Sequence, residues 1–150
     1  MEPYFKAVSI YDGPAVFLSQ FKSIPERSRH LLATHWTQSE VRNGGLIQFF
    51  DNSTGVLAPE AVEGFRHLGM PETAEALMQA IDQLGQPYPR VREIRADVLS
   101  DRFSIRGVEE EAEIDPPYPF DDLDHRMWTL FDTENGGYEA AANSFAARAK

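Results

Sequence analysis

Apolar residues recur every three or four positions along most of the chain, which is the spacing of one face of an α-helix. The first such stripe contains Phe17, Leu18 and Phe21, and Asp12 precedes it as a candidate N-terminal cap. Proline or glycine separates the later stripes, as expected where one short helix ends and another begins. These stripes lie in residues 59–69, 71–85, 91–98, 123–130 and 138–145.

One longer helix is marked at both ends. Ser23 and Glu26 have the spacing of a capping box, and Pro25 suits the first turn of a helix. Asn43 and Gly44 favour a left-handed backbone, which ends many helices. We therefore expect a helix that begins after Ser23 and stops at Asn43.

Two segments depart from this pattern. The apolar residues at 46–50 are too dense for a solvated loop, so they predict a buried helical turn before a break at 52–55. Phe103, Ile105 and Val108 alternate with polar residues as in a β-strand. This strand has no obvious partner elsewhere in the sequence, and a lone strand is not stable.

The length and composition fit one compact domain. A chain of 150 residues that is 42% hydrophobic can bury a sizeable core, but it is short for two independent domains. We expect an all-α fold, with about six to eight short helices in a single domain that spans residues 1–150. A long acidic loop that contains prolines is expected at 104–120.

Charge and cysteine content exclude several classes of function. The chain has 24 acidic and 14 basic residues, and its net charge of -10 opposes direct binding to nucleic acid or anionic lipid. The absence of cysteine excludes disulfides, thiolate metal sites and a cysteine nucleophile. No apolar run is long enough to span a membrane, and the first residues do not resemble a secretion signal, so we expect a cytoplasmic protein without membrane contact.

Acidic residues are concentrated in one segment near the C-terminus. Residues 109–124 contain eight acids and no lysine or arginine, and Pro116, Pro117 and Pro119 favour an extended connection there. Such a segment is either a binding surface for a basic partner or a solvated loop that keeps the protein soluble. The candidate partner-binding acids are Glu109, Glu110, Glu111, Glu113, Asp115, Asp121, Asp122 and Asp124.

The sequence offers little support for catalysis. His30 and His35 are five residues apart and point about 140° apart around a helix, so they cannot hold one metal from a single face. His67 lies beside an inward-facing leucine and is expected at the surface. A distant pair such as Glu40 and His125 could form a site, but the sequence gives no reason to select it. No phosphate-binding loop, zinc-protease motif or nucleophile elbow occurs. We therefore expect no catalytic residues, no metal and no cofactor, and a protein that is not an enzyme.

Residues 36–55 form a long mixed motif of polar, glycine and aromatic residues, WTQSEVRNGGLIQFFDNSTG. Part of it is repeated at 128–137, which read WTLFDTENGG. The repeat is best explained by two tryptophan-anchored helices that end in the same Asn-Gly-Gly terminator. Within the longer motif at 36–55, Glu40, Gln48 and Asn52 are expected to form a hydrogen-bonded cluster around a bend.

This motif resembles the signature of the bacterial DNA mimic protein nineteen family, a family also known as a domain of unknown function. The resemblance is best over residues 36–77 and looser in the C-terminal third. The matching positions are Glu40, Val41, Asn43, Gly44, Gly45, Gln48, Phe49, Phe50, Asn52, Ser53 and Gly55. These positions are expected to specify the fold rather than to bind a partner, because the glycines turn the chain and the aromatics fill the core.

The resemblance implies an acidic protein that competes with DNA for a basic DNA-binding protein, such as a transcription factor or nucleoid protein, and that forms a homodimer. Duplex DNA carries one charge per about 1.7 Å of its axis. Eight acids in an extended segment supply only one per roughly 7 Å. A second subunit or further acids must therefore contribute, and the candidates are Asp97, Asp101, Asp132, Glu134 and Glu139.

Two other functions fit the sequence. An immunity or antitoxin-like protein would also be acidic, but it would recognise one toxin through an apolar centre with a charged rim. A small hydrolase or ligand-binding domain would use the motif as a pocket, lined by Glu40, Asn43, Gln48 and Asn52. A closed and fully packed bend would count against the pocket.

Overall fold

The computed structural model describes residues 6–103 and 120–148. Within these ranges the protein is helical and contains no β-strand, which confirms the predicted all-α domain. The α-helices are α2 (Pro14–Ser23), α3 (Glu26–Asp51), α4 (Ala58–His67), α5 (Pro71–Asp82), α6 (Arg92–Phe103), α7 (Asp121–Thr133) and α8 (Tyr138–Ala147). Two short 3-10 helices join them, η1 (Ser53–Leu57) and η2 (Glu134–Gly136).

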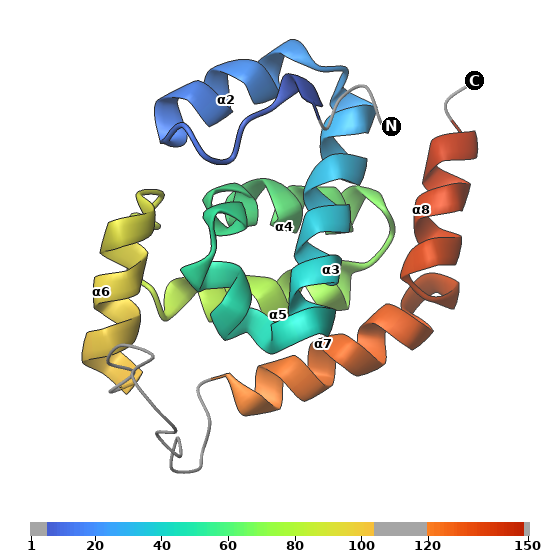
Figure 1. The fold of residues 1–150 in the computed structure, drawn as a ribbon. Coiled ribbons are helices and arrows are strands. Elements are labelled where there is room, and N and C mark those ends of the chain that lie inside the picture. The colour runs from blue at the N-terminus through green and yellow to red at the C-terminus, as the bar shows by residue number, and fades with distance from the viewer. Residues whose placement is uncertain (1–5, 104–119, 149–150) are drawn as a thin grey trace.

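Helix α3 is the centre of the fold. It packs against α4, α6, α7 and α8, while α4 also packs on α5 and α5 on α7. Helices α6 and α8 stand at opposite edges of this arrangement (Figure 1). Aromatic and aliphatic side chains from most helices are fully buried between them. They include Phe17, Leu32, Phe49, Phe50, Phe65, Leu77 and Phe131. Within the described residues, no helix is long and apolar enough to cross a bilayer.

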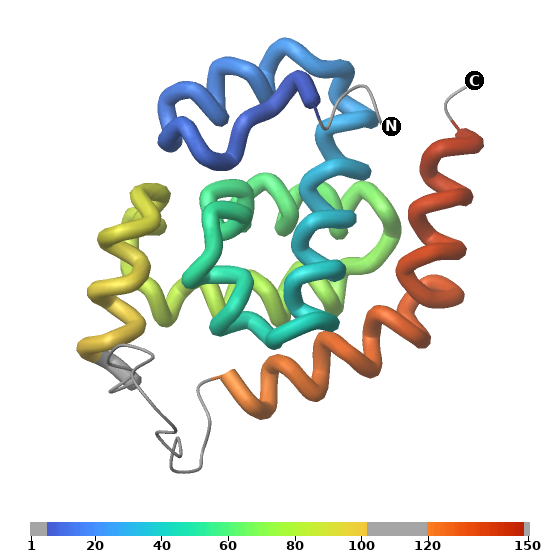
Figure 2. Tube along the Cα trace, in the orientation of Figure 1, coloured from blue at the N-terminus to red at the C-terminus, as the bar shows by residue number. Residues whose placement is uncertain are grey.

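The predicted stop at Asn43 is wrong, because α3 continues to Asp51. Asn43 and Gly44 have helical backbones, and the interruption falls at Gly45, where φ is 79° and ψ is 177°. The helix resumes after this single residue, and the path of α3 is bent (Figure 2). Glycine is suited to this position because a positive φ is strained for residues with a side chain.

Both predicted N-terminal caps are also wrong. The Ser23 hydroxyl donates to the Ser19 carbonyl at 3.2 Å, and α3 begins after Pro25 without a side-chain cap. The Asp12 carboxylate accepts a hydrogen bond from the Ser9 hydroxyl at 2.7 Å. In each case a nearby hydroxyl or carbonyl satisfies the side chain, which then does not reach the helix terminus.

The strand expected around Phe103 is not formed at that residue, which is the last of α6. Phe103 follows the buried Leu99 by one helical turn, so it continues the spacing of α6. Ile105 and Val108 lie outside the described residues.

The two Asn-Gly-Gly sequences have different backbones. After α7, Asn135, Gly136 and Gly137 all have positive φ, at 52°, 86° and 95°, and they end the helix as expected. In the first copy only Gly45 has a positive φ. The interpretation as a shared terminator therefore holds for the second copy alone.

Candidate functional site

The family motif builds the bend of α3. Glu40 precedes the interruption, and its Oε2 accepts hydrogen bonds from Gln48 Nε2 and Asn52 Nδ2, both at 3.0 Å. The expected polar cluster is therefore present, and one carboxylate joins the two arms of the bend. Asn43 is exposed and does not take part in this cluster. Three of the four polar groups predicted for a pocket, Glu40, Gln48 and Asn52, thus bond to one another across the bend.

The two glycines of the motif make room for neighbouring side chains. A Cβ atom at Gly44 would overlap the Gln48 side chain, which folds back over this position toward Glu40. A Cβ atom at Gly45 would lie 2.7 Å from Asp124 Oδ2, closer than such atoms can approach. The glycines are therefore required by the hydrogen bonds that surround them.

Helix α7 is attached to both sides of the bend. The Asp124 carboxylate accepts a hydrogen bond from the Leu46 backbone N–H at 2.7 Å, and Trp128 Nε1 donates to the Val41 carbonyl at 2.9 Å. Burial raises the pKa of Asp124 to about 6, although the hydrogen bond from Leu46 opposes this shift. Asp124, one of the candidate partner-binding acids, thus attaches α7 to the bend of α3.

A buried arginine closes the other end of the motif. Arg95 on α6 is fully buried, and its guanidinium donates to the carbonyls of Phe50 at 2.8 Å and Asn52 at 2.9 Å. It also donates to the carbonyls of Arg90 at 2.6 Å and Pro89 at 3.3 Å. Burial lowers the pKa of Arg95, yet these carbonyl oxygens stabilise its charge.

Gly55 completes this region. Its carbonyl accepts a hydrogen bond from the Tyr88 hydroxyl at 2.6 Å, and a Cβ atom there would lie 2.8 Å from Arg95 Nε. Burial raises the pKa of the Tyr88 hydroxyl well above its usual value, which keeps it a donor. Sequence reasoning did not find Arg95. The one signal is its place in an apolar stripe, one turn after Val91 and one turn before Leu99.

The remaining motif residues differ in burial. Phe49 and Phe50 are fully buried in the core. Ser53 is half-buried, and nothing in the described part of the structure explains why serine occupies this position. Most of the motif therefore has an architectural role in this structure.

The candidate partner-binding acids fall into two groups. Glu109, Glu110, Glu111, Glu113 and Asp115 lie outside the described residues. Asp121 and Asp122 lie in the first turn of α7, where Asp122 is exposed and Asp121 Oδ1 lies 3.5 Å from His125 Nε2. Negative charge at a helix N-terminus is stabilised by the helix dipole.

Helix α6 presents a row of carboxylates to solvent. Glu93, Asp97 and Asp101 are exposed and follow one another at intervals of four residues, so they share one face. Successive members are about 6 Å apart along the helix axis. Arg92 donates to the Asp51 carbonyl and Arg95 is buried, so neither forms an ion pair with the row among the described residues.

Two of the other acids predicted for the same surface, Asp132 and Glu134, have partners in the fold. Asp132 forms an ion pair with Arg42 at 3.0 Å. Glu134 caps the N-terminus of α5, where it accepts hydrogen bonds from the backbone N–H groups of Glu72 at 2.7 Å and Thr73 at 2.9 Å. Glu139 is exposed on α8. Asp97 and Asp101 therefore remain the best placed of this set.

These features define a small, acidic, all-α protein whose signature motif forms a hydrogen-bonded bend in its central helix. A family model described as DMP19-like protein matches residues 22–148, so the chain belongs to the DMP19-like family. This confirms the resemblance of the motif to DNA mimic proteins, and the matched range also includes the acidic segment. Comparisons with curated proteins and with solved structures gave no match.

Proposed function

We propose that this protein is a non-enzymatic DNA mimic that binds a basic DNA-binding protein, such as a transcription factor or nucleoid protein. Membership of the DMP19-like family supports a role of this type. The row of exposed carboxylates on α6, Glu93, Asp97 and Asp101, is the observation that carries the proposal. These groups would occupy the positions of phosphates in the binding cleft of the partner.

The charge density of the surface needs more than α6. A carboxylate every 6 Å is sparser than the charge of duplex DNA, which is one per about 1.7 Å of axis. Asp121 and Asp122 at the start of α7, together with the acids at 109–115, would raise the density. A homodimer would double the number of carboxylates. Association through such a surface is fast and weakens with salt. We place the protein in the cytoplasm, where the DNA-binding proteins of bacteria work.

The bend of α3 argues against the alternative of a hydrolase or ligand pocket. Glu40 is engaged by two amides of the same bend, so it is poorly placed to act on a substrate. The immunity or antitoxin-like alternative differs in salt dependence, because an interface with an apolar centre survives high salt. Binding measurements at two salt concentrations therefore distinguish it from a DNA mimic.

The experiment compares two triple variants with the original protein as baits in an extract of the organism that encodes it. The first variant, Glu93→Gln/Asp97→Asn/Asp101→Asn, neutralises the α6 row. The matched control, Glu72→Gln/Glu75→Gln/Asp82→Asn, removes three exposed charges from α5. We expect the control to retain a DNA-binding protein that the first variant loses, and about 0.5 M salt or excess duplex DNA to release it.

Equal capture by both variants would show that the α6 row is not the binding surface. Capture that persists at about 0.5 M salt would favour the antitoxin-like function. Each variant must unfold at the same denaturant concentration as the original protein, so that a loss of binding is not a loss of fold.

A further inference from the structure

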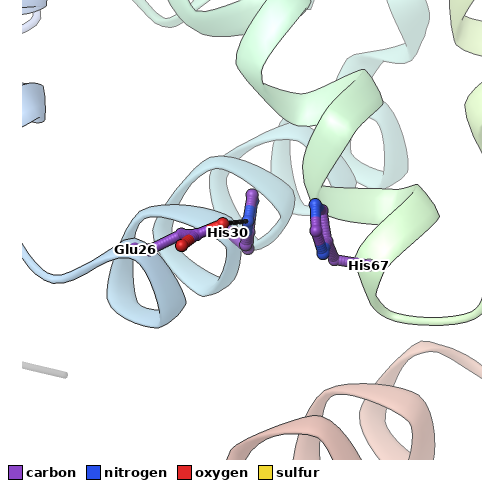
Figure 3. Close-up of side chains that lie close together, drawn as sticks. All are labelled: Glu26, His30 and His67. Carbon is purple, nitrogen blue, oxygen red and sulfur yellow. Dashed lines mark ion pairs between the residues drawn. The ribbon is translucent and has the colours of Figure 1, made fainter.

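A second site lies where α3 and α4 meet, away from the acidic row. Glu26 and His30 are one turn apart at the start of α3, and His67 is the last residue of α4 (Figure 3). Close packing of the two helices brings them together. A Cβ atom at Gly64 would lie 2.7 Å from Thr34 Cγ2 and 3.0 Å from the His30 carbonyl, so only glycine permits this approach. His67 follows Gly64 by three residues and therefore faces the same helix.

The three side chains bring their donor atoms close together. One ligand atom from each of Glu26, His30 and His67 lies within 4.8 Å of the other two. His30 Nε2 is 3.6 Å from Glu26 Oε1, which is too long for a good hydrogen bond. The imidazole rings of His30 and His67 are stacked, with centroids 4.0 Å apart and an angle of 17° between their planes.

His30 has an unused nitrogen. Its Nε2 atom is buried and has no hydrogen-bond partner among the residues that the structure describes, although buried polar atoms are normally paired. Burial and the neighbouring His67 lower the pKa of His30. An imidazole nitrogen without a hydrogen-bond partner is available to bind a metal ion.

We propose that Glu26, His30 and His67 bind one divalent transition-metal ion, such as Zn²⁺, Co²⁺ or Ni²⁺. Two imidazoles and one carboxylate suit these ions, whereas Ca²⁺ and Mg²⁺ prefer ligand sets made of oxygen. Two of the three ligands are free to adjust, because Glu26 and His67 are exposed while His30 is held between the helices. Binding requires the stacked rings to tilt so that both nitrogens point to the ion, and the exposed His67 can make this movement.

The surroundings leave one coordination position open. The three ligands line a cavity of about 360 Å³ together with Arg27, Phe145 and Arg148. The two guanidinium groups lower the affinity for a bare cation, but they favour an anionic fourth ligand such as hydroxide or a carboxylate. Phe145 packs edge-on against His30, with ring centroids 6.0 Å apart, and restricts the movement of that ring.

The chain contains a matched control. Asp121 and His125 on α7 have the same spacing of four residues, with Oδ1 and Nε2 3.5 Å apart, and no second histidine joins them among the described residues. If spacing alone produced binding, this pair would bind as well as the proposed site.

The test is a titration of untagged protein with CoCl₂, followed by visible absorption and calorimetry and repeated with ZnCl₂ as competitor. We expect one ion per chain, and a dissociation constant that rises about tenfold or more in His67→Gln and in Glu26→Gln. His125→Gln should leave the constant unchanged. His67 and Glu26 are exposed, so both variants should keep the denaturation midpoint of the original protein.

The proposal is overturned by any of three results. These are no saturable binding up to about 1 mM metal, a dissociation constant that His67→Gln and Glu26→Gln leave unchanged, or loss of binding in His125→Gln. A dissociation constant near 1 mM corresponds to only about 4 kcal/mol of binding free energy, which is typical of weak surface sites.

Discussion

The carboxylate of Asp124 accepts a hydrogen bond from the backbone N–H of Leu46, across 78 residues of sequence and at a distance of 2.7 Å. Leu46 directly follows the interruption of α3 at Gly45, where the regular hydrogen-bond pattern of the helix is broken. One side chain at the start of α7 thus satisfies a backbone donor in the family motif. The beginning of α7 therefore serves both the stability of the bend and the proposed acidic surface.

The raised pKa of Asp124 predicts a pH-dependent stability. The pKa is about 6 in the folded protein and 3.8 in an unfolded chain, so between these values only the folded state holds the proton. The contribution of Asp124 to stability therefore decreases as the pH rises from about 4 through 6. Asp124→Asn keeps an acceptor for Leu46 and does not ionise. The free energy of unfolding of this variant, minus that of the original protein, should therefore increase as the pH rises from about 4 to 6.

Urea denaturation at several pH values from 4 to 7 measures this difference. Comparison with the variant cancels the opposite contributions of His30 and His35, whose pKa values burial lowers. A difference between the two proteins that does not change with pH would show that Asp124 does not titrate in this range.

Arg95 is expected to be among the most sensitive positions of the fold. Its replacement by methionine preserves much of the volume but leaves the carbonyls of Phe50 and Asn52 without their donor. Hydrogen bonds to charged groups contribute about 1.5 to 3 kcal/mol each, so we expect a loss of about 3 kcal/mol or more. Arg92→Met removes one exposed hydrogen bond from the same helix and should cost less than about 1 kcal/mol.

Guanidinium denaturation measures the loss of unfolding free energy in both variants. Similar losses for the two variants would mean that the buried hydrogen bonds of Arg95 add little to stability. An unchanged dependence of the unfolding free energy on denaturant would confirm that both variants unfold from the same compact state.

The bond between Glu40 and Gln48 can be measured by a double-mutant cycle. We expect Glu40→Ala and Gln48→Ala each to lower the free energy of unfolding by about 1 kcal/mol. Because both remove the same hydrogen bond, the double variant should lose less than the sum by about 0.5 to 1.5 kcal/mol. Strict additivity would exclude a coupled pair.

The same Gln48→Ala variant also tests the role of the motif. If this variant were fully stable but no longer bound the partner protein, the motif would serve binding instead of folding.

Glu134 should stabilise the start of α5. It accepts two backbone N–H bonds and a third from the Thr73 hydroxyl at 2.7 Å. Helix caps of this kind contribute about 1 kcal/mol, so Glu134→Ala should lower the unfolding free energy by at least that amount. Glu139→Ala on α8 is the control, since Glu139 is exposed. Thermal denaturation that does not separate the two variants would argue against the cap.

Much of the fold follows from local patterns in the sequence. The apolar stripes locate the helices from α4 to α8, because a helical face must be buried to be stable. The caps of α2 and α3 were wrong since Ser23 and Asp12 have local partners that compete with the helix terminus. The stop predicted at Asn43 was wrong because only Gly45 has a positive φ in this segment, and α3 resumes after it.

The contacts that matter most for the sites join distant segments, and single-sequence patterns do not report them. Arg95 reaches the end of the motif across more than forty residues, and His67 meets His30 only because Gly64 lets two helices approach. A search for metal ligands within one helix therefore could not find this pair. The polar cluster around Glu40 was predictable because its members are close together in the sequence, on the two sides of one predicted bend.

Competition with DNA tests the proposed function most directly. A labelled duplex bound to the captured partner is titrated with the original protein, with the α6 variant and with the control that carries the same net charge. We expect the original protein and the control to displace the duplex at similar concentrations, and Glu93→Gln/Asp97→Asn/Asp101→Asn to require at least about tenfold more. A ternary complex, in which the partner holds duplex and protein together, would show that these carboxylates do not take the place of phosphates.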